Sequence, residues 1–550
     1  MKIKKLLCSA VLLLYTASAL CSCGIGKAEN KADNSSYINN GNYGGIAFDI
    51  TTETAATALS IPRKSGDNTD FAVYPEITED TTLPLAEENS EESEEAAEST
   101  SAEASAATVK ETTTTAKATT TTAKAATTAA KATTTTAKAT TTTTAETTVK
   151  TTTATEITTT TAAAVEETTE SYSGNTSYGV NSYTALNYKQ VKAVWISYIE
   201  INNLLQQKSE AEFRKAIGKI YDNCLSLGLN TVYVHVRAFG DAFYYSELYP
   251  FSKYVSGTLG KKTDYDPLKI MVKEAHDREI SFHAWINPLR LNSAADIASV
   301  SKAYTVGKWY NGNEKGKYIV NVGGTYFLNP AYDETIKLVG DGVREIVSGY
   351  NVDGIHIDDY FYPTTDASFD SAAYSAFGSG TLSSFRIGRC NKLVKEIYTA
   401  VNDCSSTAIF GASTQGNMYN NLTQLYADTE AWCKGGYIDY FTPQIYYGFD
   451  NSGVPFKKCL DDWSDLVSGT KVKLYAGLCL YKVGLEDTWA GTGKNEWINN
   501  RDILKRQIEY SFGKKGCDGI ALYCYNYLFS AGYHNAEIQK EIDNFKNLLK

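Results

Sequence analysis

The sequence predicts an α/β protein in which a (β/α)8 TIM barrel is preceded by a long disordered Thr/Ala-rich stalk. Two observations carry this prediction. After Asn187, eight short apolar or aromatic runs alternate with amphipathic segments over the remaining two thirds of the chain. Before that residue, no helical or alternating pattern is sustained. An open doubly wound sheet would also alternate, but eight repeats without a Gly-rich dinucleotide loop favour the barrel.

Each run has the length and composition of a buried strand. The expected strands are Ala193–Tyr198, Thr231–Arg237, Ser281–Asn287, Gly354–Tyr360, Ala408–Ser413, Tyr440–Tyr446, Lys473–Leu480 and Gly519–Tyr525. The clearest helical segments between them are Glu210–Leu227, Asp266–Arg278, Glu334–Ser348, Leu382–Val401 and Arg501–Phe512. Because the active sites of such barrels lie at the carboxyl ends of the strands, functional residues are expected there.

The first 22 residues are expected to be an export signal, since the basic residues Lys2, Lys4 and Lys5 precede the apolar stretch Leu6–Leu20. Residues 20–23, Leu-Cys-Ser-Cys, resemble a bacterial lipobox, which implies cleavage before Cys23 and lipidation of that residue. Ordinary signal-peptide cleavage, which would give a secreted protein, is the alternative. On either interpretation the protein works outside the cytoplasm, and lipidation would anchor it to the membrane surface.

Residues 23–187 are expected to form a disordered linker. Glu87–Glu103 is an acidic Ser/Ala stretch that repels itself. In the Thr/Ala-rich tract that follows, lysines recur every seven residues, at Lys117, Lys124, Lys131 and Lys138. This spacing is typical of a coiled coil, but no large apolar residue lies between the lysines to drive association. We therefore interpret the tract as a hydrated stalk that holds the domain at 188–550 away from the membrane; a spacer without function is the alternative.

The charge of the chain is unevenly distributed. Of a formal net charge of −11, the segment up to Leu186 accounts for nearly all, with 13 basic and 23 acidic residues. The part of the chain after Leu186 is close to neutral and has no excess of basic residues to attract phosphates, which argues against nucleic acid as a partner. No apolar run after the N-terminus is long enough to cross a bilayer, which argues against a polytopic membrane protein.

Polar and aromatic residues are concentrated at the ends of the predicted strands. Hydroxyl-binding groups beside aromatic faces suit a carbohydrate, because a sugar ring has apolar faces and a polar rim. The expected substrate-binding residues are Arg237, Asp241, Trp285, Asn287, Tyr360, Tyr362, Gln444 and Tyr446.

Four separated segments, Val236–Tyr244, His283–Arg290, Asp353–Pro363 and Tyr475–Gly484, resemble the glycosyl-hydrolase-like family 10 domain. The resemblance implies a barrel that acts on glycosidic bonds, and some lipoprotein members of the family are similar to hydrolases of peptidoglycan strands stripped of their peptides. One departure lies in Phe410–Gln415, where the family usually has a Ser-Pro-Phe turn.

The fourth strand also resembles the chitinase pattern of acids on alternate positions, but His356 and Tyr360 replace two of those acids. Alternation predicts that His356, Asp358 and Tyr360 face the barrel interior, with Asp359 released by the strand end. A chitinase-type acid at position 360 is therefore excluded.

Asp358 and Asp359 are the predicted catalytic pair, since adjacent like charges raise the pKa of one carboxyl. Such a pair suits substrate assistance, in which the acetamido oxygen of the sugar attacks while one Asp orients the amide and the other protonates the leaving oxygen. A two-carboxylate mechanism would instead recruit Asp241, Glu200 or Glu486. Purely structural roles are a salt bridge from Asp358 to Arg237 and a loop cap by Asp359.

His235, His283 and His356 are expected to face inward from three neighbouring strands, where they could bind zinc with Asp358. No familiar His-x-His spacing occurs, and we expect histidines hydrogen-bonded to carboxylates, with no metal and no other cofactor. Eight cysteines remain after Cys23, but their spacing supports no disulfide pair.

The predicted function is therefore that of a surface-anchored glycoside hydrolase acting on an N-acetylated cell-wall glycan of the peptidoglycan type. Its expected partners are that glycan and, through Cys23, the membrane. A non-catalytic glycan-binding lipoprotein is the competing class, which the altered fifth strand favours. A hydrolase of other polysaccharides is a third possibility.

Overall fold

The computed structural model describes residues 178–550. The predicted signal peptide, Cys23 and the linker up to residue 177 lie outside the described residues. In the described part of the chain, no helix is long and apolar enough to cross a membrane.

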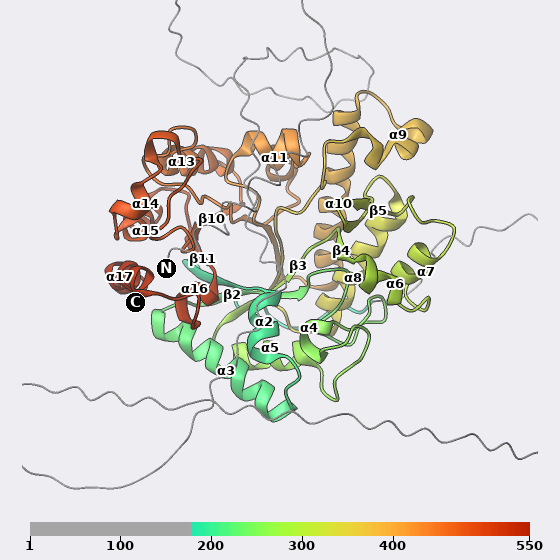
Figure 1. The fold of residues 1–550 in the computed structure, drawn as a ribbon, viewed down its shortest axis with the longest axis horizontal. Coiled ribbons are helices and arrows are strands. Elements are labelled where there is room, and N and C mark those ends of the chain that lie inside the picture. Colours follow the sequence, from blue (N-terminus) through green and yellow to red (C-terminus); the bar gives the residue numbers. More distant parts are fainter. Residues whose placement is uncertain (1–177) are drawn as a thin grey trace, which may run out of the picture. The chain divides into compact units, whose positions relative to one another are not determined.

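Eight parallel strands close into a barrel at the centre of the domain (Figure 1). In the order in which they are hydrogen-bonded, they are β1 (Val191–Ile196), β11 (Gly519–Tyr523), β10 (Lys473–Cys479), β9 (Tyr440–Phe441), β8 (Ile409–Ala412), β7 (Gly354–Ile357), β3 (Ser281–Ile286) and β2 (Thr231–Arg237), which returns to β1. The register Val191↔Gly519 joins the first strand to the last. The predicted fold class is thus confirmed, and each of the eight predicted runs overlaps one strand, although β1 begins two residues before its run.

Two strands end earlier than the apolar runs suggest. β7 stops at Ile357, so Asp358 and Asp359 follow the strand, and β9 is only two residues long. Pro443, two residues after the end of β9, has no N–H group to donate to a neighbouring strand. Isolated bridges from Gln444 to Gln415 and to Gly477 continue the pairing beyond β9. Asp358, Asp359 and Gln444 thus lie beyond the ends of β7 and β9, at the carboxyl end of the barrel.

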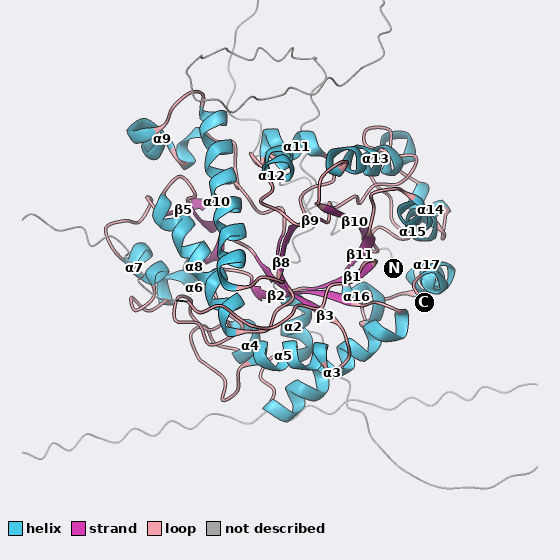
Figure 2. Ribbon diagram, turned by 180° about the vertical axis from the view of Figure 1, so that it is seen from behind, coloured by secondary structure: helices cyan, strands magenta, loops and turns pink. Residues whose placement is uncertain are grey.

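Helices surround the barrel, as Figure 2 shows with the strands at the centre. The main ones are α3 (Glu210–Leu227), α5 (Pro267–His276), α8 (Asp333–Gly349), α10 (Leu382–Cys404), α13 (Phe456–Val467), α15 (Ile503–Gly513) and α17 (Ala536–Phe545). The five predicted helices are confirmed, whereas α13 and α17 were not predicted.

Helix α3 illustrates why these segments form helices. Ser209 and Glu212 form a capping box at its start, and Gly228 ends it at a φ of 89°, which a residue with a side chain rarely adopts. Between these caps, apolar residues at helical spacing, such as Phe213, Ile217 and Ile220, are buried. A capped amphipathic segment of this kind packs one face on the barrel and leaves the other to solvent.

The connection between β3 and α8 carries a small antiparallel sheet that was not predicted. Its strands are hydrogen-bonded in the order β4 (Arg290–Ser293), β6 (Thr325–Leu328) and β5 (Ile319–Val322). Helices α6 (Ala294–Ser299) and α7 (Thr305–Asn311) belong to the same insertion and lie beside it (Figure 1).

Shorter helices complete the connections: α2 (Tyr198–Leu205), α4 (Lys253–Ser256), α9 (Ser371–Phe377), α11 (Met418–Gln424), α12 (Thr429–Gly435), α14 (Glu496–Asn499) and α16 (Tyr525–Phe529), with 3-10 turns at Ala367–Phe369, Gly491–Gly493 and Lys546–Leu548.

Histidine and aromatic rings fill the barrel interior. Trp195 Nε1 donates to His356 Nε2 over 3.2 Å, so the proton of the neutral imidazole resides on Nδ1, which lies 3.0 Å from the Tyr440 hydroxyl. That hydroxyl can then donate to His283 Nδ1, 2.8 Å away. Burial lowers the pKa of His283 to about 4 and that of His356 well below its usual value, so both rings stay neutral.

The three histidines thus face inward as predicted, but the expectation of carboxylate partners is wrong. His283 and His356 contact a phenol, and His235 contacts the amide of Asn287. The reason is that the barrel interior at these levels holds Tyr, Trp and Asn side chains, which satisfy a neutral imidazole without a buried charge.

Candidate functional site

Asp358 and Asp359 lie directly after β7, at the carboxyl end of the barrel strands, and are only 3% and 8% exposed. The indole Nε1 of Trp285, at the end of β3, donates to Asp358 Oδ2 over 3.2 Å. The backbone N–H of Tyr360 approaches the other oxygen of Asp358 at 3.4 Å. Asp358 therefore points to the β3 side of the barrel opening.

Asp359 is held by different partners, from the β8 and β9 side. Gln444 Nε2 donates to Asp359 Oδ1 over 3.2 Å and also to the Ser413 carbonyl over 3.0 Å. The Gln415 side chain is a second hydrogen-bond partner of Asp359. The two adjacent carboxyls thus belong to two separate hydrogen-bond networks, which allows them different roles.

Burial raises the pKa of both carboxyls, and for Asp358 the charge of Asp359 adds to the effect. The pKa of Asp358 lies well above its usual range, while the Gln444 amide partly offsets the rise for Asp359. Of the two carboxyls, Asp358 is therefore the one that holds its proton to the higher pH.

Trp285 is positioned by His235, whose ring stacks on the indole with centroids 3.3 Å apart. His235 Nδ1 accepts from the backbone N–H of Tyr198 over 3.1 Å, so Nε2 bears the proton and donates to Asn287 Oδ1 over 3.2 Å. Burial lowers the pKa of His235 to about 3, which keeps this arrangement neutral. Asn287 thus acts indirectly, because it fixes the His235 ring on which Trp285 stacks.

Arg290 is a site residue that sequence reasoning missed. Its guanidinium carbon lies 4.7 Å from the Phe239 ring centroid and 4.9 Å from that of Tyr360. Its positive charge lowers the pKa of both Asp358 and Asp359, which places it on their side of the barrel. The residue ends the His283–Arg290 segment and begins β4, a strand that was not predicted, so a search restricted to the ends of the predicted strands does not reach it.

Tyrosines surround the carboxyl pair. Tyr446 lies with its ring centroid 5.8 Å from that of Tyr523 and 5.9 Å from that of Tyr481. Tyr360 is half-buried and packs on Arg290. Tyr360, Tyr481 and Tyr523 are half-buried, whereas Tyr446 is 5% exposed. A half-buried ring offers an apolar face for a sugar together with a hydroxyl for its rim. The predicted residues Trp285, Asn287, Tyr360, Gln444 and Tyr446 are therefore brought together around Asp358 and Asp359.

Arg237 is placed apart from this group. The pairing of β2 with β3 shifts between His235 and Arg237, so one extra residue in β2 reverses the inward alternation. The guanidinium carbon lies 4.5 Å from the Tyr249 ring centroid, and a Cβ at Gly342 in α8 would be only 2.1 Å from its Nη1. Arg237 is the last residue of β2, but its side chain points to α8, which corrects its expected place among the residues at the barrel opening and the suggested salt bridge with Asp358.

Asp241 and Tyr362 also have structural environments away from the pair. Asp241 is fully buried and accepts the backbone N–H of Phe239 over 3.0 Å, which braces its own loop. Tyr362 is 1% exposed and packs edge-on against Phe369 and Tyr426. The position of Tyr362 corrects its prediction as a stacking platform, since its loop folds back onto its own core.

The other acids considered for a two-carboxylate mechanism also have hydrogen-bond or ion-pair partners of their own. Glu200 is buried, caps α2 through Ser197 and accepts the backbone N–H of Asn526 over 3.2 Å. Glu486 is exposed and forms an ion pair with Lys494 at 3.0 Å. Neither contact involves Asp358 or Asp359.

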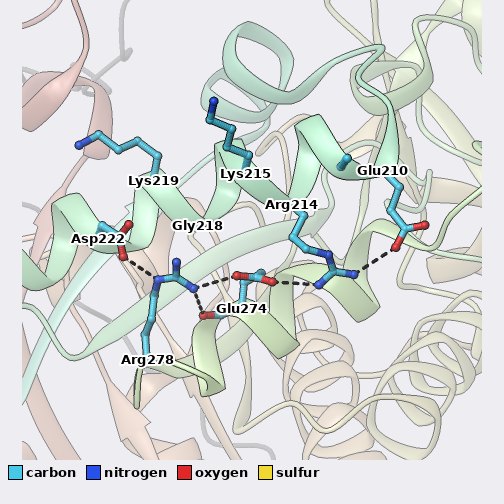
Figure 3. Close-up of a pocket in the computed structure, with 9 residues that line it drawn as sticks. Glu210, Arg214, Lys215, Gly218, Lys219, Asp222, Glu274 and Arg278 are labelled. Carbon is cyan, nitrogen blue, oxygen red and sulfur yellow. Dashed lines mark hydrogen bonds and ion pairs between the residues drawn. The ribbon is translucent and has the colours of Figure 1, made fainter.

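A groove between α3 and α5 lies on the outer face of the domain and is occupied by ion pairs (Figure 3). Arg214 bridges Glu210 and Glu274, and Arg278 joins Glu274 to Asp222. These contacts tie the two helices together. The groove holds none of the predicted site residues.

Among residues 178–550, no group of three or more His, Cys, Asp or Glu side chains is arranged to hold a metal ion. The eight cysteines of the same range carry free thiols, and all except Cys517 are buried.

A closed eight-stranded parallel barrel with a buried carboxyl pair beside Trp and Tyr rings at the carboxyl end of its strands defines a glycosidase-like (β/α)8 protein. The glycosyl hydrolase-like 10 family model matches residues 190–491, more than half of the chain, and the protein belongs to that family. The resemblance found in the sequence is thereby confirmed.

Curated relatives are named glycosyl hydrolases. The chain is 30% identical over 345 residues to glycosyl hydrolase YngK of Bacillus subtilis, across 58% of this chain and 66% of the relative, slightly less than two thirds of its length. It is 28% identical over 356 residues to glycosyl hydrolase DigH of Escherichia coli K12, across 60% of this chain and 80% of the relative.

Among solved structures, the PgaB (BpsB) glycoside hydrolase domain from Bordetella bronchiseptica is similar in fold. It is 10% identical, with a TM-score of 0.41, over 65% of this chain and 99% of that domain.

Proposed function

We propose that this protein is a glycoside hydrolase of N-acetylated cell-wall glycan strands of the peptidoglycan type, with Asp358 as the acid and Asp359 as the residue that orients the acetamido group. The observation that carries the proposal is the buried carboxyl pair, in which Asp358 contacts Trp285 and Asp359 contacts Gln444. Membership in the glycosyl hydrolase-like 10 family supports it.

The proposed first step uses the substrate's own acetamido oxygen as the nucleophile. That oxygen attacks C1 of the sugar, and the bond from C1 to the leaving oxygen breaks as Asp358 transfers its proton to that oxygen. The Asp359 carboxylate accepts the acetamido N–H and stabilises the positive charge of the cyclic intermediate. The stronger rise in the pKa of Asp358 supports this assignment, since an acid must hold its proton and an orienting carboxylate must be ionised.

The second step restores the enzyme. The ionised Asp358 takes a proton from a water molecule as that water attacks C1, and the cyclic intermediate opens to regenerate the acetamido group. Two displacements at C1 leave its configuration unchanged. The mechanism needs no third carboxyl. This agrees with the contacts of Asp241, Glu200 and Glu486, which bind partners other than Asp358 and Asp359.

The test compares the full-length protein with Asp358→Asn and Asp359→Asn on peptide-free peptidoglycan strands, following product mass. Each substitution should lower kcat by about 100- to 10,000-fold. On an N-acetylglucosaminide with a nitrophenyl leaving group, which needs no protonation, Asp358→Asn should regain activity and Asp359→Asn should not. Asp462→Asn, which removes an exposed partner of Lys458, is the matched control and should leave activity unchanged.

A non-catalytic glycan-binding protein is the second candidate, and the altered fifth strand favours it. The segment Phe410–Gln415 lacks the Ser-Pro-Phe turn usual in the family, so the β8 side of the site departs from the family pattern. If the wild-type protein retains the strands on a solid support but releases no shortened product, the hydrolase proposal is rejected in favour of the binder. Cleavage of unsubstituted glucans in preference to acetamido sugars would instead support a hydrolase of other polysaccharides.

The membrane anchor is part of the same proposal, since a lipid on Cys23 would keep the enzyme at the cell surface. The basic and apolar segments before Cys23 support it. Metabolic labelling with an alkyne fatty acid should label the wild-type protein and not Cys23→Ala. Labelling that persists in the variant would reject Cys23 as the acceptor, and an unlabelled wild-type protein in the medium would indicate secretion.

A further inference from the structure

Arg290 differs from most arginines of the described domain in having no counterion. Seven of the nine arginines between residues 178 and 550 form ion pairs, and Arg237 is buried against Tyr249. Arg290 is half-buried, and within the described residues its guanidinium takes part in no ion pair and no side-chain hydrogen bond. Its N–H donors are therefore available to a ligand.

The guanidinium is nevertheless held in place. Phe239 and Tyr360 contact it at 4.7 Å and 4.9 Å from their ring centroids. Its backbone is fixed in β4, where Arg290 pairs with Phe327. A guanidinium whose faces lie on aromatic rings keeps its N–H edges free, and those edges match the two oxygens of a carboxylate.

The contacts of Arg290 place it beside the reacting groups. Tyr360, on which it packs, is the residue after Asp359, and Phe239 follows β2 on the neighbouring side. The charge of Arg290 acts on Asp358 and Asp359, yet within the described residues its guanidinium forms no direct ion pair with either carboxyl. A positive group that is rigid, half-exposed and next to the carboxyl pair suits an anionic substituent on the substrate.

We propose that Arg290 binds a carboxylate of the glycan next to the scissile bond and so selects acidic sugar residues over neutral ones. The inference rests on the proposed glycosidase function and names the chemical class of its substrate. In peptidoglycan strands without peptides, the lactyl group of each muramic residue ends in a free carboxylate, whereas in peptide-bearing strands that carbon belongs to an amide. Chitin-type oligosaccharides have the acetamido group but no carboxylate.

The experiment uses the full-length protein and three substrates: peptide-free strands, the same strands with their carboxylates amidated by carbodiimide and ammonia, and chitin oligosaccharides. The wild type should cleave the strands with free carboxylates about 10- to 100-fold more efficiently than the amidated ones, as a charged hydrogen bond is lost. Arg290→Gln should abolish this preference, mainly through a higher KM for the strands with free carboxylates. Arg290→Lys should retain part of it.

Arg506→Gln, which removes an exposed arginine paired with Asp502, is the matched control and should retain the full preference. An equal loss of kcat on all three substrates in Arg290→Gln would overturn the proposal, because Arg290 would then act through the aspartates. A wild type that shows no preference between free and amidated strands would also overturn it.

A binding experiment distinguishes a failure of the Arg290 proposal from a failure of the proposed glycosidase function. The inactive Asp358→Asn protein and its double variant with Arg290→Gln are compared for retention on immobilised strands. If the wild type cleaves nothing, the glycosidase proposal fails, yet weaker retention of the double variant on free-carboxylate strands alone would still support Arg290. Equal retention of both variants on both strand types would reject it.

Discussion

The indole of Trp285 donates a hydrogen bond to Asp358 across 3.2 Å, from the end of β3 to the residue that follows β7. Since a donor stabilises the charged form of a carboxyl, this bond restrains the rise in pKa that burial imposes on Asp358. It also fixes the direction of the carboxyl that we propose as the acid. The relationship leads to the first prediction.

Trp285→Phe keeps an aromatic ring against His235 but removes the N–H group. The pKa of Asp358 should rise further, so the basic limb of the pH profile of kcat moves to higher pH. Because the Asp358 carboxyl would lose its fixed orientation, kcat at neutral pH should fall by about 10- to 100-fold. Trp489→Phe, at an indole 63% exposed, is the control and should change neither quantity. A basic limb that stays in place would contradict the role of the bond.

Gln415→Phe removes a hydrogen-bond partner of Asp359 and introduces an aromatic residue in the segment where the family usually has a Ser-Pro-Phe turn. Without it the pKa of Asp359 should rise, and because this residue must be ionised, the acidic limb of kcat/KM should move to higher pH. The loss of one hydrogen bond corresponds to about a fivefold lower rate at neutral pH. Gln424→Phe, at an amide that contacts Thr423 in α11, is the control. An unchanged acidic limb would show that Gln415 does not influence Asp359.

Glu541 links stability to pH. It is 1% exposed, and burial raises its pKa from the ordinary value of 4.5 to about 7. Because the protonated form is favoured by folding, its contribution is fully present below pH 4.5 and is lost as pH rises to about 7. The loss amounts to about 3 kcal/mol. Glu541→Gln should therefore flatten the decline of unfolding free energy between these pH values, as measured by urea denaturation. An identical pH dependence in the variant would refute the assignment.

The ion pair of Arg386 and Asp370 supports the loop that contains Tyr362. Its N–O distance is 2.6 Å, and both side chains are fully buried. Asp370→Asn leaves a buried guanidinium without its counterion and should cost about 3–5 kcal/mol in the free energy of unfolding. The exposed pair of Lys458 and Asp462 is the comparison, where Asp462→Asn should cost about 0–1 kcal/mol. Similar losses for both variants would contradict the importance of burial.

Much of the site follows from the chain's local pattern. Apolar runs predicted the strands, and the position of Asp358 and Asp359 at the end of one of them placed both carboxyls at the barrel opening. Trp285 and Gln444 followed from the same rule, because the carboxyl ends of parallel strands meet at one end of a barrel.

Arg237 and Arg290 are two residues whose positions this rule does not predict. Alternation predicts an inward Arg237, but an extra residue in β2 turns its side chain towards Gly342 in α8. Arg290 follows a strand end and would be assigned to a loop, yet β4 pairs with β6 and brings it between Phe239 and Tyr360.

The sequence by itself determined the eight-fold alternation, the barrel and the adjacent carboxyl pair, because side-chain periodicity and strand ends are local properties of the chain. Only the tertiary structure decided that Asp358 and Asp359 have separate partners, that the interior histidines are neutral, and that Arg290 lies at the site while Arg237 does not. These features depend on contacts between segments far apart in the chain and on the burial that such contacts produce. Neither the contacts nor the burial follows from the spacing of residues along one strand.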